Sequence, residues 1–276
     1  MNASRRPQHD GFSLIEIAVV LVIISVLVTM VAVPLATQIE QRRGDDTRKQ
    51  IELAKEALIG FAMANGRMPC PANPDPASTT GAASYCQLGT GSCTATTVTT
   101  SAILAHGKCA YSNGMLPAVT LGIAPVDAQG YAVDAWQDGS TLHRIRYAVS
   151  KFESPAGIFP VTSTNGIRTA TMDTVAIPAS VHLYVCGLGL TAASSTTACS
   201  VGVTTLNDRA VAVVYSVGKN ATTAFASLSF DEQNNQGNNA DIVFTSGDTN
   251  TTFDDIVSWI SINTLFARMV QAGKLP

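Results

Sequence analysis

The strongest pattern in the chain is a long apolar run near its beginning. Residues 1–11 are polar, and nearly every residue from 12 to 39 is apolar or small, except Glu16, Gln38 and a few hydroxyl residues. Residues 17–36 are enough to cross a bilayer, because about 20 helical residues span roughly 30 Å of hydrocarbon. The run is longer than the core of a cleavable secretory signal, so the pattern predicts a retained membrane helix.

A second apolar pattern, with helical spacing, follows this run. Apolar residues recur every three or four positions among charged ones: Ile51, Ala54, Leu58 and Phe61. This periodicity predicts an amphipathic helix, and Gly66 followed by Pro69 predicts its end. Pro34 is expected to bend or loosen the membrane-spanning half. A separate soluble helix after a linker at 42–46 is the alternative.

Beyond residue 67, strand candidates alternate with loops. The candidates are rich in β-branched and aromatic residues: 143–149, 181–186, 210–217 and 241–244. A final helix, capped by Ser261 or Asn263, is predicted to reach Gln271 and to stop at Gly273. Residues 85–101 are dense in Thr, Ser and Gly and predict an exposed loop. The predicted fold class is α+β, with a long N-terminal helix packed on an antiparallel β-sheet domain.

The composition favours an exported protein. The 276 residues carry a net charge of −3, and only 13% of them are charged, which is about half of what a soluble domain usually has. No basic run could neutralise several phosphates together, so no nucleic acid partner is expected. Arg5 and Arg6 before the apolar run predict a cytoplasmic N-terminus, although Arg42 and Arg43 beyond it weaken the rule.

The six cysteines all lie beyond the apolar run, and none forms a CxxC pair. This spacing does not favour a zinc site, whereas an even count fits disulfides formed in an oxidising compartment. Other pairings stay open, but nearness in the sequence favours three pairs: Cys86–Cys93, Cys186–Cys199 and, by remainder, Cys70–Cys109. Disulfides would place the domain that follows the membrane helix outside the cytoplasm.

Glu16 is unusual because placing a charged carboxylate in a membrane helix costs about 3 kcal/mol of free energy. The order Gly11-Phe12-Ser13-Leu14-Ile15-Glu16 resembles the prepilin signature of type IV pilins and type II secretion pseudopilins. The resemblance implies a cut after Gly11 and methylation of Phe12. It also implies that the amine of Phe12 pairs with Glu16 of a neighbouring subunit during assembly, which neutralises both charges in lipid.

The resemblance covers residues 11–66 and implies a pilin-like fold in four parts. These are a cleaved cytoplasmic leader, a transmembrane half of the helix, an amphipathic half and a periplasmic domain: 1–11, 12–39, 40–66 and 67–276. The location it implies is the inner membrane, as a single-pass protein, and then the filament. The implied partners are a prepilin peptidase and methylase, other pilin or pseudopilin subunits, and inner-membrane lipid.

The expected function is that of a structural, minor subunit of a type IV pilus or a type II secretion pseudopilus. The sequence does not choose between the two machines. Two alternatives stay open: a pilus-borne adhesin or binding module, and a membrane-anchored periplasmic enzyme. The first would need exposed aromatic residues gathered in a groove, and the two tryptophans, Trp136 and Trp259, are far apart in the sequence.

The sequence contains only partial matches to catalytic motifs. Ser216 and Lys219 have the SxxK spacing of some serine hydrolases, but the partner motifs of that class are missing. Gly187-Leu188-Gly189 lacks the rest of a dinucleotide loop. The four histidines are scattered: His9, His106, His143 and His182. We therefore expect no enzyme activity and no organic cofactor.

One segment offers a metal candidate. Residues 231–241 place carboxylates and amide oxygens around a glycine, and such oxygens are what Ca²⁺ requires. The candidate ligands are Asp231, Asn235, Asn239 and Asp241. Further ligands would come from Asp248, Asp254 and Asp255 only if the fold brought them near. The segment departs from the EF-hand spacing and lacks its closing glutamate, so a solvated loop is the alternative.

Overall fold

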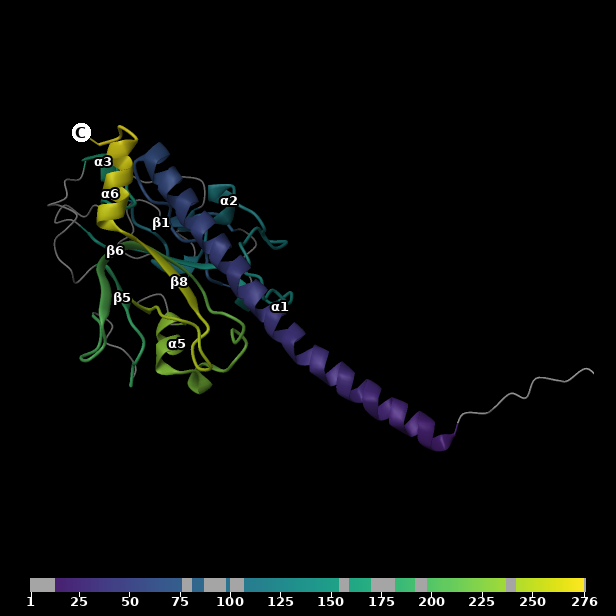
Figure 1. Ribbon diagram of the computed structural model, residues 1–276. Helices are drawn as coiled ribbons and strands as arrows, with labels where there is room; N and C mark the ends of the chain where they lie inside the picture. The colour runs from purple at the N-terminus through teal and green to yellow at the C-terminus, as the bar shows by residue number, and fades with distance from the viewer. Residues whose placement is uncertain are drawn as a thin grey trace, which may run out of the picture. The chain divides into compact units, whose positions relative to one another are not determined.

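The computed structural model describes residues 13–75, 81–86, 98–99, 107–153, 159–169, 182–191, 198–236 and 242–275. For 29–36, 85–86 and 98–99 it describes the backbone only. The chain divides into two compact units, Met1–Arg43 and Gly44–Pro276. The fold is a mixture of α and β, with a long N-terminal helix and a curled sheet (Figure 1).

The first element is helix α1, Leu14–Asn65. Helix is assigned without interruption through Pro34 and through 42–46, where the alternative placed a linker. The helix ends where the sequence predicts, because Gly66 has a φ of 68° and its N–H donates to the Ala62 carbonyl at 2.7 Å. Such left-handed backbone is cheap for glycine and closes many helices.

The part of α1 in the second unit is amphipathic, as its periodicity predicts. Ile51, Ala54 and Leu58 are buried, while Leu53, on the opposite side of the helix, is 66% exposed. Ile59 and Ala62 extend the buried stripe, whereas Phe61 is only partly buried. The stripe is therefore slightly rotated from the predicted one.

The main sheet has the strand order β3-β4-β6-β5-β7, with β8 paired to β6 outside this path. Its strands are β3 (Asn113–Met115), β4 (Arg146–Val149), β5 (Leu183–Cys186), β6 (Thr205–Ser216), β7 (Val243–Thr245) and β8 (Ile256–Ser261). A second pair is formed by β1 (Tyr85–Cys86) and β2 (Val98–Thr99). The long strand β6 pairs with β4, β5 and β8, so it holds the sheet together.

All four predicted strands are present, with shifted ends, as β4, β5, β6 and β7. The sheet is not wholly antiparallel as predicted, because β7 runs parallel to β5. The chain returns to the sheet through helix α5 (Phe230–Asn235), which reverses its direction before β7. Strands β3 and β8 were not predicted, and neither were β1 and β2, which pair across the segment 85–101 that was predicted to be a loop.

Residue propensities do not predict strand β3, because it contains Asn113 and Gly114, two residues that strands disfavour. Its middle residue lies against the segment after α1: a Cβ at Gly114 would collide with the carbonyl oxygen of Ala72. Ala72 and Met115 exchange backbone hydrogen bonds of 2.9 and 3.1 Å. The strand therefore depends on the close approach of its backbone to that of Ala72.

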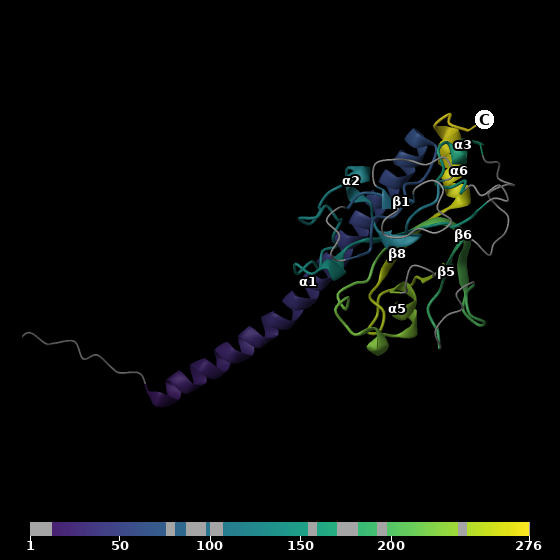
Figure 2. The same ribbon diagram turned by 180° about the vertical axis from the view of Figure 1, so that it is seen from behind.

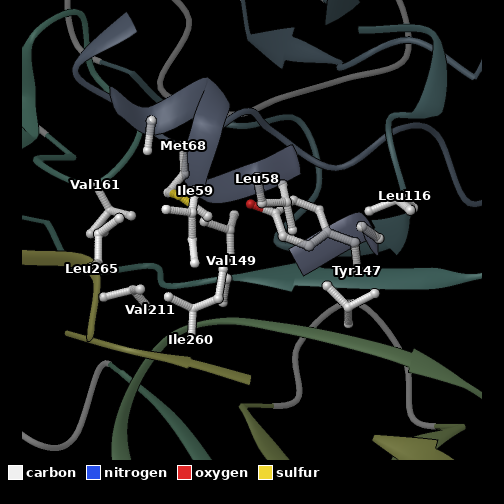
Figure 3. Packing of buried hydrophobic residues seen from close by; sticks show 14 of the residues in the cluster. Leu58, Ile59, Met68, Leu116, Tyr147, Val149, Val161, Val211, Ile260 and Leu265 are labelled. Atoms are coloured by element: carbon white, nitrogen blue, oxygen red, sulfur yellow. The ribbon is translucent and has the colours of Figure 1, made fainter. Parts of the chain in front are cut away.

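The larger core lies between the sheet and two helices, α1 and α6 (Ile262–Gln271). Figure 3 shows Leu58 and Ile59 of α1 near Val149 of β4, Val211 of β6 and Leu265 of α6. Helix α6 begins as predicted, because the Ser261 hydroxyl accepts a hydrogen bond from the Thr264 N–H. Gly273, at a φ of 64°, follows its end.

A second buried cluster lies on another part of the sheet and includes Val185, Val213, Tyr215 and Phe244. Strand β6 contributes to both clusters, which explains why it reads as a nearly continuous apolar run. Figures 1 and 2 show α5 and α6 at opposite ends of β8. The end of β8 near α5 carries the acidic residues described below.

Two disulfides match the predicted pairing, Cys70–Cys109 and Cys186–Cys199. The first holds the segment after α1, and the second joins the end of β5 to the turn that leads into β6. The third predicted pair, Cys86–Cys93, includes Cys93, which lies outside the described residues.

The remaining described helices are short: α2 (Ala118–Leu121), α3 (Gly166–Thr169), and the 3₁₀ turns Thr141–His143 and Phe225–Ser227. Helix α5 is also short but has a full capping box. The Ser229 hydroxyl accepts from the Glu232 N–H, and the Glu232 carboxylate accepts from the Ser229 N–H. This box fixes the Glu232 carboxylate at the start of α5.

Candidate functional site

The N-terminal candidate site begins at the first turn of α1. The Ser13 carbonyl accepts hydrogen bonds from the N–H groups of Glu16 and Ile17, at 3.0 and 3.2 Å. Glu16 is thus in the first helical turn and is exposed, where the helix dipole favours a negative charge. Gly11 and Phe12, the predicted processing residues, lie outside the described residues.

Glu16 is surrounded in the sequence by apolar residues whose side chains are also exposed. From Leu14 to Val28 the large apolar side chains keep between 48% and 87% of their accessible surface, on every side of the helix. A helix that is apolar all round is normally covered by protein or lipid. The first unit therefore has the Glu16 carboxylate in the first turn of a helix whose apolar side chains from Leu14 to Val28 are exposed.

Two of the four predicted calcium ligands, Asp231 and Asn235, lie in the described residues, and each has partners within the protein. The Asp231 carboxylate accepts hydrogen bonds from the N–H groups of Gly189 and Leu190, at 3.1 Å each for the shortest contacts. Asn235 bonds instead to both backbone groups of Thr245. Asn239 and Asp241 lie outside the described residues.

A different acidic cluster is formed by Glu232, Asp254 and Asp255, and one oxygen of each lies within 4.8 Å of the others. Burial, and then the charge of Glu232, raise the pKa of Asp254 to about 6, against the hydrogen bond from the Lys219 N–H. Burial also raises the pKa of Asp255 well above its usual range, although Asn235 donates a hydrogen bond to it. Burial and the neighbouring carboxylates therefore both disfavour the charged forms of Asp254 and Asp255.

The N-terminal site lies within a known family motif. Residues 6–32 match the family model described as the prokaryotic N-terminal methylation motif. The chain carries a prepilin methylation motif. This motif is the signature of type IV pilins and pseudopilins. No curated protein and no solved structure matches the chain.

The methylation motif covers the start of the predicted membrane segment. Within the described ranges, no helix combines the length and the apolar character needed to cross a membrane. The side chains of residues 29–36, which complete the predicted span 17–36, lie outside the described residues.

Outside the methylation motif, the SxxK pattern does not form a catalytic pair. The Ser216 hydroxyl is buried and donates to Asp134 Oδ2 at 2.6 Å, while it accepts from the Gly218 N–H at 3.1 Å. Lys219 is exposed. Ser216 therefore has its donor committed to a carboxylate and serves the packing of the domain.

A serine and a histidine that the sequence did not connect do meet. Ser150 Oγ lies 3.0 Å from His182 Nδ1, where β4 ends and β5 begins, and both residues are buried. The Ser150 hydroxyl also accepts from the Phe152 N–H at 3.3 Å, and the Phe152 ring lies 5.7 Å from that of His182. These contacts join two strands that both pair with β6.

Sequence reasoning could not find the acidic cluster or this pair, because their members lie far apart in the chain. Asp254 and Asp255 were noted only as distant additions to the loop 231–241. The sequence does contain one signal for the position of Glu232. Ser229 and Glu232 have the spacing of a capping box, which marks the start of a helix and so places the carboxylate in its first turn. His143, also noted as scattered, has Nδ1 3.5 Å from Asp134 Oδ1.

Proposed function

We propose that the chain is a structural, minor subunit of a type IV pilus or a type II secretion pseudopilus. It would be made as a prepilin, cut between Gly11 and Phe12 by the prepilin peptidase and methylated at Phe12. The observation that carries this proposal is the match of residues 6–32 to the methylation motif. The short polar leader and Glu16 stand at the spacing of the prepilin signature.

The exposed apolar surface of α1 supports assembly through this helix. Large exposed apolar patches on a protein usually mark a surface that lipid or another protein covers. The side chains from Leu14 to Val28 form such a patch around the helix. In the proposal, inner-membrane lipid covers them first, and neighbouring subunits cover them in the filament.

Glu16 then gives the assembly a direction. Its carboxylate would pair with the methylated amine of Phe12 in a neighbouring subunit, because each charge is costly alone in an apolar environment. The two groups belong to different surfaces of successive subunits. Such a heterologous contact does not close on itself and so propagates as an open helical filament.

The domain would be displayed by the filament. Its disulfides, Cys70–Cys109 and Cys186–Cys199, suit a periplasmic or extracellular location. An aromatic binding groove is not favoured in the described residues, since Trp136 packs on the core beneath α1 and Trp259 packs on the other cluster. We therefore prefer a structural role over that of an adhesin.

The test is mass spectrometry of the mature N-terminus, on protein expressed with and without the prepilin peptidase of the host. We expect a chain that begins at Phe12 and carries one added methyl group only when the peptidase is present. The matched control is Gly11→Ala at the cut site, which should leave the leader attached. A mature chain that begins at Met1 in the presence of the peptidase would contradict the proposal, as would a cut beyond residue 36.

A further inference from the structure

A cavity of about 570 Å³ lies beside the end of β4, in the second unit. Three segments supply its described lining: 108–112 before β3, 149–153 at and after the end of β4, and 159–162. Sites for small organic molecules typically measure about 300–1,000 Å³. The cavity therefore has the size for a small molecule and is too small for a folded partner.

The walls of this cavity are fixed by contacts within the domain. A disulfide to Cys70 holds Cys109, which is part of the lining. Thr162, another lining residue, donates from its hydroxyl to the Gly107 carbonyl at 2.6 Å. A site whose walls are already ordered loses little conformational entropy when a ligand binds, so even a small ligand can be held.

The charges of the lining favour an anion. Two lysines, Lys108 and Lys151, and one acidic residue, Glu153, line the cavity among the described residues. Both lysines are half-buried, whereas Glu153 is exposed. Solvent screens an exposed charge more strongly than a partly buried one. The field inside the cavity is therefore positive, and it attracts a negatively charged group.

The Ser150 hydroxyl gives the cavity an adjustable hydrogen-bonding group. Ser150 lines the cavity and is only 3% exposed, and its Oγ accepts from the Phe152 N–H at 3.3 Å and lies 3.0 Å from His182 Nδ1. His182 is buried and is not among the described lining residues, so it acts on a ligand through Ser150. With a proton on Nδ1, His182 donates to Ser150 Oγ, and the hydroxyl can turn its own proton toward an acceptor in the cavity.

Apolar surface completes the lining. Phe159 is half-buried and Val149 is buried, and both line the cavity beside the polar groups. Small-molecule sites usually combine such apolar walls with a few polar groups that fix the orientation of the ligand. An inorganic anion would leave the apolar wall uncovered, whereas an organic acid covers it with its carbon skeleton.

We infer that this cavity binds a small organic acid. Lys108 and Lys151 supply the positive charge, Ser150 donates a hydrogen bond to the carboxylate, and His182 positions the Ser150 hydroxyl. An acidic sugar and the carboxyl end of a peptide both carry this chemistry. The inference does not depend on the proposed assembly function, because every residue involved belongs to the second unit.

The test measures binding to the full, oxidised chain in a non-ionic detergent by ligand-observed NMR titration. The probes are two matched pairs, each an acid and its neutral counterpart: galacturonate with galactose, and N-acetylalanine with N-acetylalaninamide. At least one acid should bind in a saturable manner with a Kd of about 1 mM or lower, and its neutral counterpart at least about tenfold more weakly. The acid that binds more tightly identifies the source, sugar or peptide. Added NaCl should weaken its binding.

Variants of the charged lining residues locate the site. Lys108→Gln and Lys151→Gln should each weaken the binding of the acid about fivefold or more, because each removes a positive charge. Glu153→Gln should strengthen it, because it removes a repulsive charge, and a loss of packing would not have this sign. The matched control is Lys274→Gln, since Lys274 is exposed and is not among the described lining residues.

Two measurements test the hydroxyl. Ser150→Ala should weaken the binding of the acid, and the neutral counterpart should lose less. In the complex with the wild type, nitrogen NMR of the His182 ring should show a proton on Nδ1, because only then can the Ser150 proton turn toward the ligand. A ring with its proton on Nε2 alone would remove Ser150 as the donor and contradict the inference.

Other results would overturn the inference as a whole. A chain that binds neither acid has no such site. Equal affinities for an acid and its neutral counterpart would show that the lysines do not select a carboxylate. Binding that survives both lysine variants, or that is lost in Lys274→Gln, belongs to other residues. Should Ser150→Ala fail to fold, the two lysine variants decide, because both lysines are only half-buried.

Discussion

Asp134 is one of the buried carboxylates that hold the domain together at the scale of single residues. It is 3% exposed, and its oxygens accept from the Ser216 hydroxyl and from the Trp136 N–H at 2.6 and 2.9 Å. Burial raises its pKa, while the hydrogen bond from Ser216 and the charge of His143 lower it. Burial has the larger effect, so the Asp134 carboxyl group binds a proton more readily in the folded chain than in the unfolded chain.

This balance predicts a pH dependence of stability. A raised pKa means that the folded state binds more protons, so stability falls as pH rises from the ordinary value of 3.8 to the raised pKa of Asp134. Where one proton separates the two states, the free energy of unfolding falls by about 1.4 kcal/mol per pH unit. Asp134→Asn should flatten this part of a curve of unfolding free energy against pH.

The matched control for Asp134 is Asp138→Asn. Asp138 is exposed and only accepts a local hydrogen bond from the Ser140 N–H. Its variant should keep the slope of the wild type. Equal slopes in the wild type and in Asp134→Asn, measured by chemical unfolding between about pH 3 and pH 7, would contradict the assignment.

At the scale of elements, the two parts of α1 carry two different hydrophobic patterns. From Leu14 to Val28 the helix is apolar on every side, whereas after Gly44 it is apolar on one side only. The difference follows from what covers each part, since an amphipathic helix packs on a protein core through its apolar stripe. Leu58 lies in that stripe, and Leu53 lies opposite to it.

Replacement of these two leucines should separate packing from helix propensity. Leu58→Ala should lower the free energy of unfolding by about 2–5 kcal/mol, because it removes buried methyl groups and leaves a cavity. Leu53→Ala makes the same chemical change at an exposed site and should alter stability by less than about 0.5 kcal/mol. Denaturant unfolding of the full chain measures both. Similar losses in the two variants would show that Leu58 does not pack on the domain.

At the scale of the whole molecule, assembly is the property that the proposal assigns to the first unit. Glu16→Leu should leave membrane insertion unchanged, because it makes the segment more apolar. It should strongly reduce incorporation into filaments, because the amine of Phe12 in the neighbouring subunit loses its partner. Immunoblots of the membrane fraction and of sheared filaments measure the two properties separately.

Ser25→Ala is the control for Glu16. It removes another polar group from the same helix, but Ser25 carries no charge, and its hydroxyl donates to the Val22 carbonyl of the same helix at 2.8 Å. This variant should assemble like the wild type. Unchanged incorporation of Glu16→Leu would refute the pairing role of Glu16, even if the cut after Gly11 were correct.

The sequence by itself determined the features that depend on neighbouring residues. The methylation motif, the stop of α1 at Gly66, the cap of α6 at Ser261 and the pairing of Cys186 with Cys199 all involve residues close in the chain. Their physical causes are local: helix periodicity, capping hydrogen bonds and short loop closure. The long-range pair Cys70–Cys109 followed only as the remainder.

Only the tertiary structure decided the rest. Strand β3 pairs with Ala72 of the segment after α1, and β7 lies parallel to β5, whose position in the sheet is set by its pairing with β6. Glu232 meets Asp254 and Asp255 because α5 packs beside the start of β8, and no periodicity could reveal that meeting. Contacts between distant segments depend on the packing of the whole core. For that reason, the sequence by itself identifies the methylation motif at residues 6–32, and only the folded domain brings the three carboxylates together.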